Sequence, residues 1–223
     1  MGRVRNGVHQ LSIVTRCVLA GSDPGLQGGY TVVESACERF RYNPDRIGVI
    51  GESAGGHLVA MLGATTGQSK FDVGENLTVT SDVNCVIDLF GVSDFAGLTD
   101  AAGLLLGPEN KNNPDLIKSI SPVTYVHKDE PPILIVHGDS DKLVPDEQAT
   151  RLANVLDKVG ARYHFHTVIG GGQNPYFGLN PNPASGKFDA GDGGVGIFAD
   201  PDVQPMIKAY LRRYLLNKDQ GEA

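Results

Sequence analysis

Apolar residues follow two kinds of spacing along this chain, and the two kinds alternate. Short continuous or alternating apolar runs predict β-strands, whereas apolar residues that recur every three to four positions predict helices with one buried face. Strands are predicted at residues 8–15, 47–51, 84–90, 132–137 and 162–169. Helices are predicted at 31–41, at 53–63, between Pro145 and Gly160, and at 202–217. This alternation predicts an α/β fold, a mostly parallel sheet with helices on both faces.

Two segments interrupt the alternation. Residues 92–130 mix short helical patches with Gly, Asn and Pro, and we interpret them as an insertion over the site. Residues 170–196 are rich in Gly, Asn, Pro and Asp, which predicts a long surface loop. Because 223 residues suit one well-buried domain, residues 1–223 are predicted to form a single domain.

The most informative motif joins a predicted strand to a predicted helix. Residues 47–61 read IGVIGESAGGHLVAM, and Ser53 occupies the turn between the two elements. A sharp strand-to-helix turn strains the backbone of its apex residue and requires small neighbours on either side, which Gly51 and Gly55 supply. The turn lifts the serine hydroxyl above the sheet and aims the N-terminus of the helix at whatever the serine attacks. We therefore predict a nucleophile elbow with Ser53 as the nucleophile.

A turn rich in carboxylates directly follows the apolar run 132–137. Asp139 and Asp141 come just after the carboxyl end of this strand, at the sheet edge where α/β proteins place their sites. Either aspartate can orient a histidine in a serine hydrolase. The other interpretation, a turn aspartate that caps the next helix, fits Asp139 or Asp146.

Three segments together resemble the α/β-hydrolase esterases: IGVIGESAGGHL at the elbow, NPDLIKSISPVTYV (113–126) and PPILIVHGDSDKLVP (131–145). The group is similar to bacterial carboxylesterases and xylan- or feruloyl-esterase-like enzymes, which are related to prolyl-oligopeptidase-type catalytic domains, and the resemblance covers roughly residues 28–173. It implies that Asp141, in the HGxxDxxV pattern, is the acid and that the backbone N–H of Ala54 is an oxyanion donor. It also implies a small-molecule ester substrate, such as a carbohydrate-linked acetyl or feruloyl ester, and no cofactor.

One position departs from the pattern of these esterases. The resemblance implies a catalytic histidine in the loop after the last strand. Residues 169–174 read IGGGQN, so Gln173 stands in the place of that histidine, and no histidine follows His166 in the sequence. A neutral amide can hydrogen-bond Ser53 but cannot accept and return a proton near neutral pH, so we expect impaired turnover. Three explanations are open. The substitution was made deliberately to trap a substrate or acyl complex, or it marks a natural inactive relative, or another histidine takes over the role of the base.

The remaining histidines give little support to compensation. His57 lies on the helix after Ser53, on a face away from the serine, and is predicted to be a buried histidine bonded to backbone. His137 ends a predicted strand and is expected to prop the loop of the acid. His164 and His166 lie inside the last predicted strand, before the loop that should carry the base, and are expected to be structural.

The N-terminal part departs from the resemblance as well. The resembled esterases take a second oxyanion donor from an HGGG-type loop, and no such motif occurs in this sequence. Only 46 residues precede the elbow strand, fewer than the several strands that the fold usually supplies first. We therefore expect an N-terminally shortened chain that lacks the usual N-terminal strands, with a gap beside the elbow strand and exposed strand edges.

Composition excludes several classes of protein. A net charge of −7 argues against nucleic acid as a partner, because phosphate binding needs a basic face. No apolar run reaches the length of a membrane span, and Arg16 interrupts the short apolar stretch near the start of the sequence, which argues against an export signal. Three widely spaced cysteines fit reduced thiols and a cytoplasmic location. The DAGDGG stretch at 189–194 lacks the glutamate of a calcium loop, so no metal is expected.

Three hypotheses for function follow. The first is a serine carboxylesterase-type hydrolase of acyl esters, impaired as written because of Gln173. The second, from a different class, is a catalytically inactive hydrolase-fold binding protein. The third is a prolyl-oligopeptidase-type peptidase, which the short chain and the missing propeller domain argue against. The pattern leaves acyl specificity, alcohol specificity and oligomeric state open.

Overall fold

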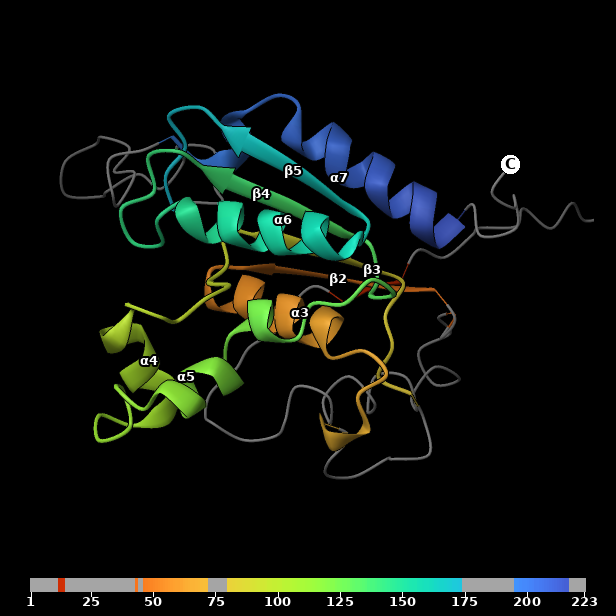
Figure 1. The fold of residues 1–223 in the computed structure, drawn as a ribbon. Coiled ribbons are helices and arrows are strands. Elements are labelled where there is room, and N and C mark those ends of the chain that lie inside the picture. Colours follow the sequence, from red (N-terminus) through yellow and green to blue (C-terminus); the bar gives the residue numbers. More distant parts are fainter. Residues whose placement is uncertain (1–11, 15–42, 44–45, 72–79, 174–194, 217–223) are drawn as a thin grey trace, which may run out of the picture.

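The computed structural model describes residues 12–14, 43, 46–71, 80–173 and 195–216. Within these residues five parallel strands form one sheet in the order β1-β2-β3-β4-β5 (Figure 1). The strands are β1 (Ser12–Val14), β2 (Ile47–Glu52), β3 (Cys85–Leu89), β4 (Ile133–Gly138) and β5 (Tyr163–Val168). From β2 onward each strand agrees with a predicted strand to within one residue at either end, which confirms the predicted parallel sheet.

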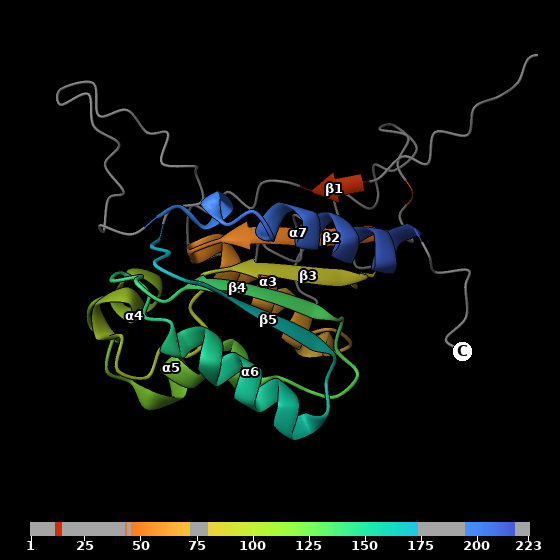
Figure 2. The ribbon, with the colours of Figure 1, turned by 90° about the horizontal axis from the view of Figure 1, so that it is seen from above.

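Helices cover both faces of the sheet, as predicted. The long helices are α3 (Ala54–Ala64), α6 (Glu147–Val159) and α7 (Val203–Leu211). Figures 1 and 2 show α3 and α6 on one face and α7 on the other. α6 ends at Gly160, whose φ of 73° gives the left-handed C-cap that the sequence predicts. The helix predicted at 202–217 is α7 followed by a π-helical turn at Arg212–Leu216, and the one predicted at 31–41 lies outside the described residues.

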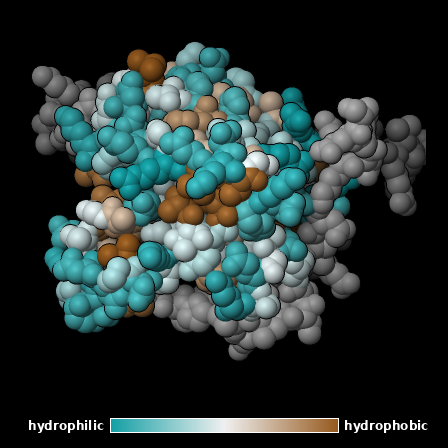
Figure 3. All heavy atoms as spheres, viewed as in Figure 1, coloured by the Kyte–Doolittle hydropathy of each residue, from teal (hydrophilic) through white to brown (hydrophobic). Residues whose placement is uncertain are grey.

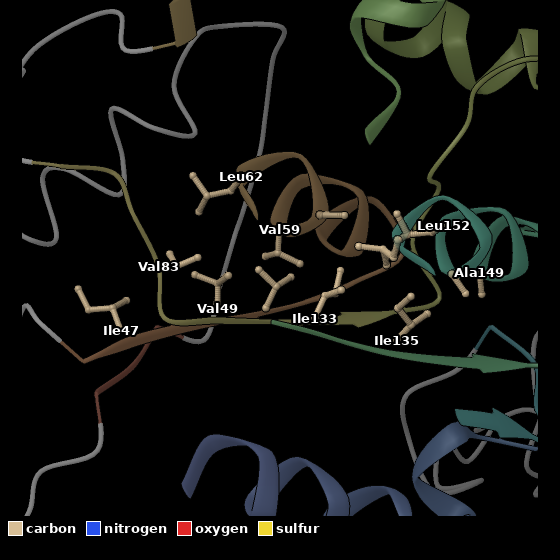
Figure 4. Packing of buried hydrophobic residues seen from close by; sticks show 13 residues of the cluster. Ile47, Val49, Val59, Leu62, Val83, Ile133, Ile135, Ala149 and Leu152 are labelled. Carbon is tan, nitrogen blue, oxygen red and sulfur yellow. The ribbon is translucent and has the colours of Figure 1, made fainter. Parts of the chain in front are cut away.

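Strand β4, which lies between β3 and β5, separates two apolar cores. Its residues Ile133 and Ile135 face α3 and α6, where they pack with apolar side chains of both helices (Figure 4). The alternate residues Leu134 and Val136 face the opposite core, which includes residues of α7. Successive side chains of a strand point to opposite faces, so a strand buried on both faces needs an unbroken apolar run. The sequence 132–137 meets this requirement.

The outer surface over α3 and α6 is mainly hydrophilic, with an apolar patch near the centre of the view (Figure 3). In α6, the residues that face the sheet include Leu152 and Leu156, which are buried, whereas Arg151 and Asp157 are exposed. α6 is thus anchored by one apolar face and leaves the other to solvent, as helical spacing in the sequence indicates.

The first strand corrects one expectation. β1 pairs in parallel with β2, with Ser12 opposite Ile47 and Val14 opposite Val49. The expected gap beside the elbow strand is therefore occupied along this half of β2. A strand edge presents unpaired backbone groups, and an extended apolar segment earlier in the chain satisfies them. The strand predicted at 8–15 is described only at its centre, where it is confirmed.

The segment 92–130 forms a small helical layer rather than an irregular insertion. It contains α4 (Thr99–Leu106), α5 (Pro114–Ser119) and a 3-10 turn, η2 (Pro122–Thr124). Asn113 starts α5 by accepting hydrogen bonds from the amides of Asp115 and Leu116, and Pro114 suits the first helical position. This layer has its own apolar core, to which Val144 from the loop after β4 contributes.

Three short turns complete the described structure: the 3-10 turns η1 (Ser69–Phe71) and η3 (Ile197–Ala199), and the π-helical turn η4 (Arg212–Leu216). Of the loop predicted at 170–196, residues 174–194 lie outside the description. Among the helices that are described, none has both the length and the apolar character that crossing a membrane requires.

Candidate active site

Ser53 forms the predicted strained turn between β2 and α3. Its backbone has φ 52° and ψ −117°, a conformation that a residue with a side chain rarely adopts and that costs roughly 1–3 kcal/mol. The Ser53 amide donates a hydrogen bond to the Leu89 carbonyl of β3 at 2.9 Å, and the Ser53 carbonyl accepts one from the His57 amide at 3.0 Å. The end of β3 and the first turn of α3 thus hold the strained residue in place.

The small residues around the elbow are required at positions that differ in part from those expected. A Cβ atom on Gly51 would overlap the carbonyl of Gly55, so a glycine is needed at Gly51, as predicted. A Cβ atom on Gly55 would meet open space. The steric requirement expected there falls instead on Gly56, where a Cβ would collide with the Asp88 carboxylate and the Gly91 backbone. The loop after β3 packs directly onto α3 at this point.

Ala54 is the first residue of α3, directly after Ser53. The first amides of a helix have no intrahelical acceptor, and the helix dipole favours negative charge near them. The Ala54 N–H is therefore suited to the oxyanion role that the resemblance implies, and that role stays a prediction.

Gln173 lies against the serine. Its side-chain Nε2 donates a hydrogen bond to Ser53 Oγ, with 2.5 Å between the two atoms, across 120 positions of sequence. The residue that stands in the place of the histidine thus reaches the predicted nucleophile. Within the described chain, no histidine makes a hydrogen bond to Ser53.

Close backbone contacts fix the loop that carries Gln173. Gly170 turns the chain with a φ of 71°, and the Gly171 carbonyl accepts a hydrogen bond from the Ser140 amide at 2.9 Å. A Cβ atom on Gly138, at the end of β4, would overlap that same Gly171 carbonyl. Gly171 also pairs with Val195 as an isolated β-bridge. Gly170 and Gly171 therefore allow the loop after β5 to pack closely against the loop after β4.

Asp141 is a buried carboxylate with two differently occupied oxygens. Its Oδ1 accepts hydrogen bonds from the amides of Leu143 at 2.9 Å and Val144 at 2.8 Å. Its side chain is completely buried, and Oδ2 has no hydrogen-bond partner among the residues that the structure describes. A buried acceptor without a donor is costly, which makes Oδ2 ready to accept an N–H from a neighbouring side chain.

The alternative aspartates occupy other places. Asp139 is exposed, and its Oδ1 accepts hydrogen bonds from the Gly170 amide at 2.7 Å and the Ser140 hydroxyl at 3.2 Å. Asp139 therefore ties the turn after β4 to the loop after β5. Asp146 precedes α6 but makes no capping hydrogen bond through its side chain, so the capping interpretation is wrong for this residue.

The histidines lie where structural roles were predicted. His57 Nε2 lies 2.8 Å from the Ile120 carbonyl, its ring meets Phe95 edge-on, and burial lowers its pKa. His166 Nε2 lies 2.9 Å from Asp200 Oδ2, which links β5 to the segment before α7. These contacts confirm His57 as a buried histidine bonded to backbone.

Two polar residues of the site region were not singled out in the sequence. Asp88 is buried within β3, accepts a hydrogen bond from the Gly91 amide at 2.9 Å, and has a pKa raised to about 6, mainly by burial. Gln148 in α6 is also buried, and its Oε1 accepts hydrogen bonds from the amides of Ser93 at 3.0 Å and Asp94 at 2.8 Å. The available signal was a polar residue inside an otherwise apolar strand or helix face.

No group of three or more His, Cys, Asp or Glu side chains that could hold a metal ion occurs in the part of the chain that the structure describes. The arrangement at the carboxyl edge instead joins a strained serine, a helix N-terminus, an amide at hydrogen-bond distance and a buried carboxylate. A strained serine, a helix N-terminus and a buried carboxylate suit acyl transfer, whereas an amide cannot accept a proton.

Known proteins share this sequence and architecture. The chain is 31% identical over 136 residues to the probable carboxylic ester hydrolase LipM of Mycobacterium tuberculosis, a match that covers 57% of this chain and 31% of LipM. A truncated form of a carbohydrate esterase from gut microbiota superposes with a TM-score of 0.65 at 30% identity, over 84% of this chain and 67% of that one.

A thermophilic esterase from Thermogutta terrifontis, Est2, shares the fold, with a TM-score of 0.62 at 22% identity over 90% of this chain and 66% of its own. The chain spans about a third of the length of the curated relatives it matches. The model of the BD-FAE family matches residues 30–156, more than half of the chain. This α/β-hydrolase-like chain therefore belongs to the BD-FAE family.

Proposed function

We propose that this chain carries the site of a serine carboxylic ester hydrolase, with Ser53 as nucleophile, Asp141 as acid and position 173 as the place of the base. The observation that carries the proposal is the 2.5 Å hydrogen bond from Gln173 Nε2 to Ser53 Oγ. The side chain at this position reaches the serine from the loop where such a site needs its histidine. The buried Oδ2 of Asp141, which accepts no hydrogen bond from the described residues, adds support, because the acid of a triad accepts an N–H from that histidine.

Gln173 keeps a hydrogen bond to the serine but lacks the proton acceptor that a catalytic base supplies. Its amide donates to Ser53 Oγ, but it cannot take the proton that the hydroxyl must lose when Oγ attacks an ester carbonyl. The Ala54 amide at the start of α3 would still stabilise a tetrahedral oxyanion. Since loss of a triad base costs on the order of 10⁴–10⁶ in turnover, we expect the chain as written to hydrolyse esters slowly or not at all.

For the substrate we propose small acyl esters, with carbohydrate-linked acetyl or feruloyl esters as the physiological class. The similarity to a carbohydrate esterase and to a carboxylic ester hydrolase supports this choice. The helical layer of 92–130 lies beside the carboxyl edge and would shape the pocket, because loops at that edge set specificity in α/β proteins. Acetylated and feruloylated xylo-oligosaccharides distinguish the two acyl groups.

The test is the substitution Gln173→His. In this variant the imidazole would take the Ser53 Oγ proton as Oγ bonds to the carbonyl carbon, and would return it to the leaving alcohol as the ester C–O bond breaks. We expect hydrolysis of p-nitrophenyl acetate to rise by about 10²-fold or more.

Two controls make the test specific. Gln173→Asn keeps an amide and should give no increase, and Gln173→His combined with Ser53→Ala should lose the gain. If Gln173→His hydrolyses no faster than Gln173→Asn while both variants remain folded, the proposed roles are wrong.

A second candidate function is a hydrolase-fold binding protein without catalysis. The Gln173 amide favours this candidate, because it hydrogen-bonds Ser53 Oγ but cannot accept the Ser53 proton. This candidate predicts that a serine-directed fluorophosphonate fails to label the chain as written and that Ser53→Ala binds acetylated xylo-oligosaccharide as tightly as the parent. Labelling of Ser53, or loss of binding in Ser53→Ala, would favour the esterase proposal.

A further inference from the structure

Two buried titratable side chains that the proposed mechanism does not use lie on neighbouring strands of the sheet. Asp88 is on β3 and His137 is on β4. Because Asp88 is in register with Ile135, His137 lies two residues further along the neighbouring strand, on the same face of the sheet. This is the face covered by α3 and α6.

His137 holds the loop of the acid through a carbonyl. Its Nε2 lies 2.8 Å from the Val144 carbonyl oxygen, so this nitrogen carries a hydrogen and donates it. The amide of the same Val144 donates to Asp141 Oδ1 at 2.8 Å. Both backbone groups of Val144 are thus hydrogen-bonded, its carbonyl to His137 and its amide to the Asp141 carboxylate.

His137 also faces Asp141 electrostatically. Its Nε2 lies 3.5 Å from Asp141 Oδ2, a charge contact rather than a well-formed hydrogen bond, and both side chains are almost completely buried. Burial alone would keep the imidazole neutral. The contact with Asp141, the Val144 carbonyl and the charge of Asp88 together outweigh burial and raise the pKa of His137.

Asp88 connects this histidine to the nucleophile elbow. Its Oδ1 accepts the Gly91 amide and lies against Gly56 in the first turn of α3, where no Cβ atom would fit. Burial raises the pKa of this carboxyl, and the electrostatic interaction with His137 opposes that effect. Asp88 therefore contacts the helix that follows Ser53 and interacts with the residue that holds the acid loop.

We propose that Asp88 and His137 form a buried positioning pair that fixes the loop of Asp141 relative to the nucleophile elbow. The consequence for catalysis rests on the proposed function, because it assumes that Asp141 is the acid. The hydrogen bonds that hold Val144, from His137 and to Asp141, do not depend on the proposed function. Neither Asp88 nor His137 touches the substrate or the reacting atoms in this proposal.

The first experiment needs no activity. Amide hydrogen exchange at Leu143 and Val144 is measured by NMR in the full chain and in His137→Gln, which places an amide N–H near the position of Nε2, and in His137→Leu, which has no donor. We expect exchange at both amides to rise by about 10²-fold or more in His137→Leu and by less than about tenfold in His137→Gln. His164→Leu, at an exposed position of β5, is the matched control and should leave both amides unchanged.

The second experiment tests the charge. The ring of His137 is titrated by NMR in the parent and in Asp88→Asn, an isosteric substitution that keeps an oxygen to accept the Gly91 amide. Removing the neighbouring carboxylate should lower the titration midpoint of His137 by about one pH unit. An unchanged midpoint, or unchanged exchange at Leu143 and Val144 in His137→Leu, would overturn the pair. If His137→Leu does not fold, Asp88→Asn and His137→Gln decide alone.

The third experiment separates this proposal from the proposed function. In the Gln173→His background, His137→Leu should lower kcat by about 10²-fold and change KM little, since a displacement of about 1 Å in a catalytic group has an effect of this size. If the Gln173→His parent is inactive but exchange at Val144 rises as expected, the proposed function fails and the pair stands. If the parent is active and His137→Leu alters neither kcat nor exchange, the pair fails and the function stands.

Discussion

The two sides of the site are built in different ways. The nucleophile side, the elbow from β2 through Ser53 into α3, is one continuous stretch of chain, with Gly51 against the Gly55 carbonyl and with further support from the Leu89 carbonyl at the end of β3. The acid-and-base side consists of two loops, one after β4 and one after β5, joined by contacts such as the Ser140 amide to the Gly171 carbonyl. A continuous motif carries its own geometry, whereas the second side exists only because distant segments meet.

This difference also separates the position that departs from the resembled esterases from the rest of the site. Gln173 lies on the acid-and-base side, in a loop held by glycine contacts and backbone hydrogen bonds as well as by the hydrogen bond from its own side chain to Ser53 Oγ. The backbone contacts are made by main-chain atoms, so they do not require a particular side chain at 173. The strained backbone of Ser53, by contrast, depends on close packing at Gly51 and Gly56.

The largest expected effect breaks the nucleophile side. Gly51→Ala places a Cβ atom inside the Gly55 carbonyl, and both partners are backbone that cannot move aside without unmaking the elbow. We expect the free energy of unfolding to fall by more than about 4 kcal/mol, measured by urea denaturation.

The neighbouring elbow glycine provides the matched control. Gly55→Ala meets open space within a helix, and should be neutral or stabilising by about 0.5–1 kcal/mol. Equal destabilisation by both substitutions would show that the motif, rather than the contact at Gly51, sets the requirement.

The second prediction concerns the attachment of the helical layer of 92–130. Gln148→Ala leaves the amides of Ser93 and Asp94 without their acceptor, and the Ser93 amide is buried. Two donors that lose their acceptor should lower the free energy of unfolding by about 3 kcal/mol. Thr150→Ala, at an exposed position of the same helix, is the control. A loss below about 1 kcal/mol would mean that water replaces Gln148 and that the layer is held mainly by its apolar core.

Sequence patterns revealed the features that depend on neighbouring positions and missed those that depend on long-range contacts. Strands, helices and the elbow were predictable because apolar spacing and the GESAG string act within a few positions. Gly56, Asp88 and Gln148 were missed because their roles depend on contacts with segments brought close only by folding, such as Gln148 with Ser93, 55 positions apart. The expected gap beside β2 was wrong for the same reason, since pairing with Ser12–Val14 is a long-range contact.

The third prediction concerns how stability depends on pH through Asp88, whose carboxylate lies against Gly56 of the nucleophile side. Burial raises the pKa of Asp88 to about 6, above its value of about 3.9 in an unfolded chain. Between these values the folded state binds more protons than the unfolded state, so this contribution to stability is complete below about pH 4 and is lost as pH rises through 6. Asp88→Asn removes it. The unfolding free energy of Asp88→Asn relative to the parent should therefore rise by about 2 kcal/mol from pH 4 to pH 7, and a flat difference would contradict the raised pKa.

The smallest expected effect has the opposite sign and concerns Asp200, which lies between η3 and α7 and outside the two loops of the acid-and-base side. Asp200 has a pKa below its usual range because it accepts the Asp202 amide and pairs with His166 on β5, the strand that leads into the loop of Gln173. A lowered pKa contributes stability above the unfolded value of about 3.9, and that contribution is lost as pH falls through the folded value. Asp200→Asn should thus be less stable than the parent at pH 6, and the difference should close in acid. The pair is partly exposed, so the difference should be smaller than that of Asp88→Asn and should shrink further in high salt. Opposite pH trends for the two substitutions would confirm that folding raises the pKa of Asp88 and lowers that of Asp200. Parallel trends would contradict one of these two directions.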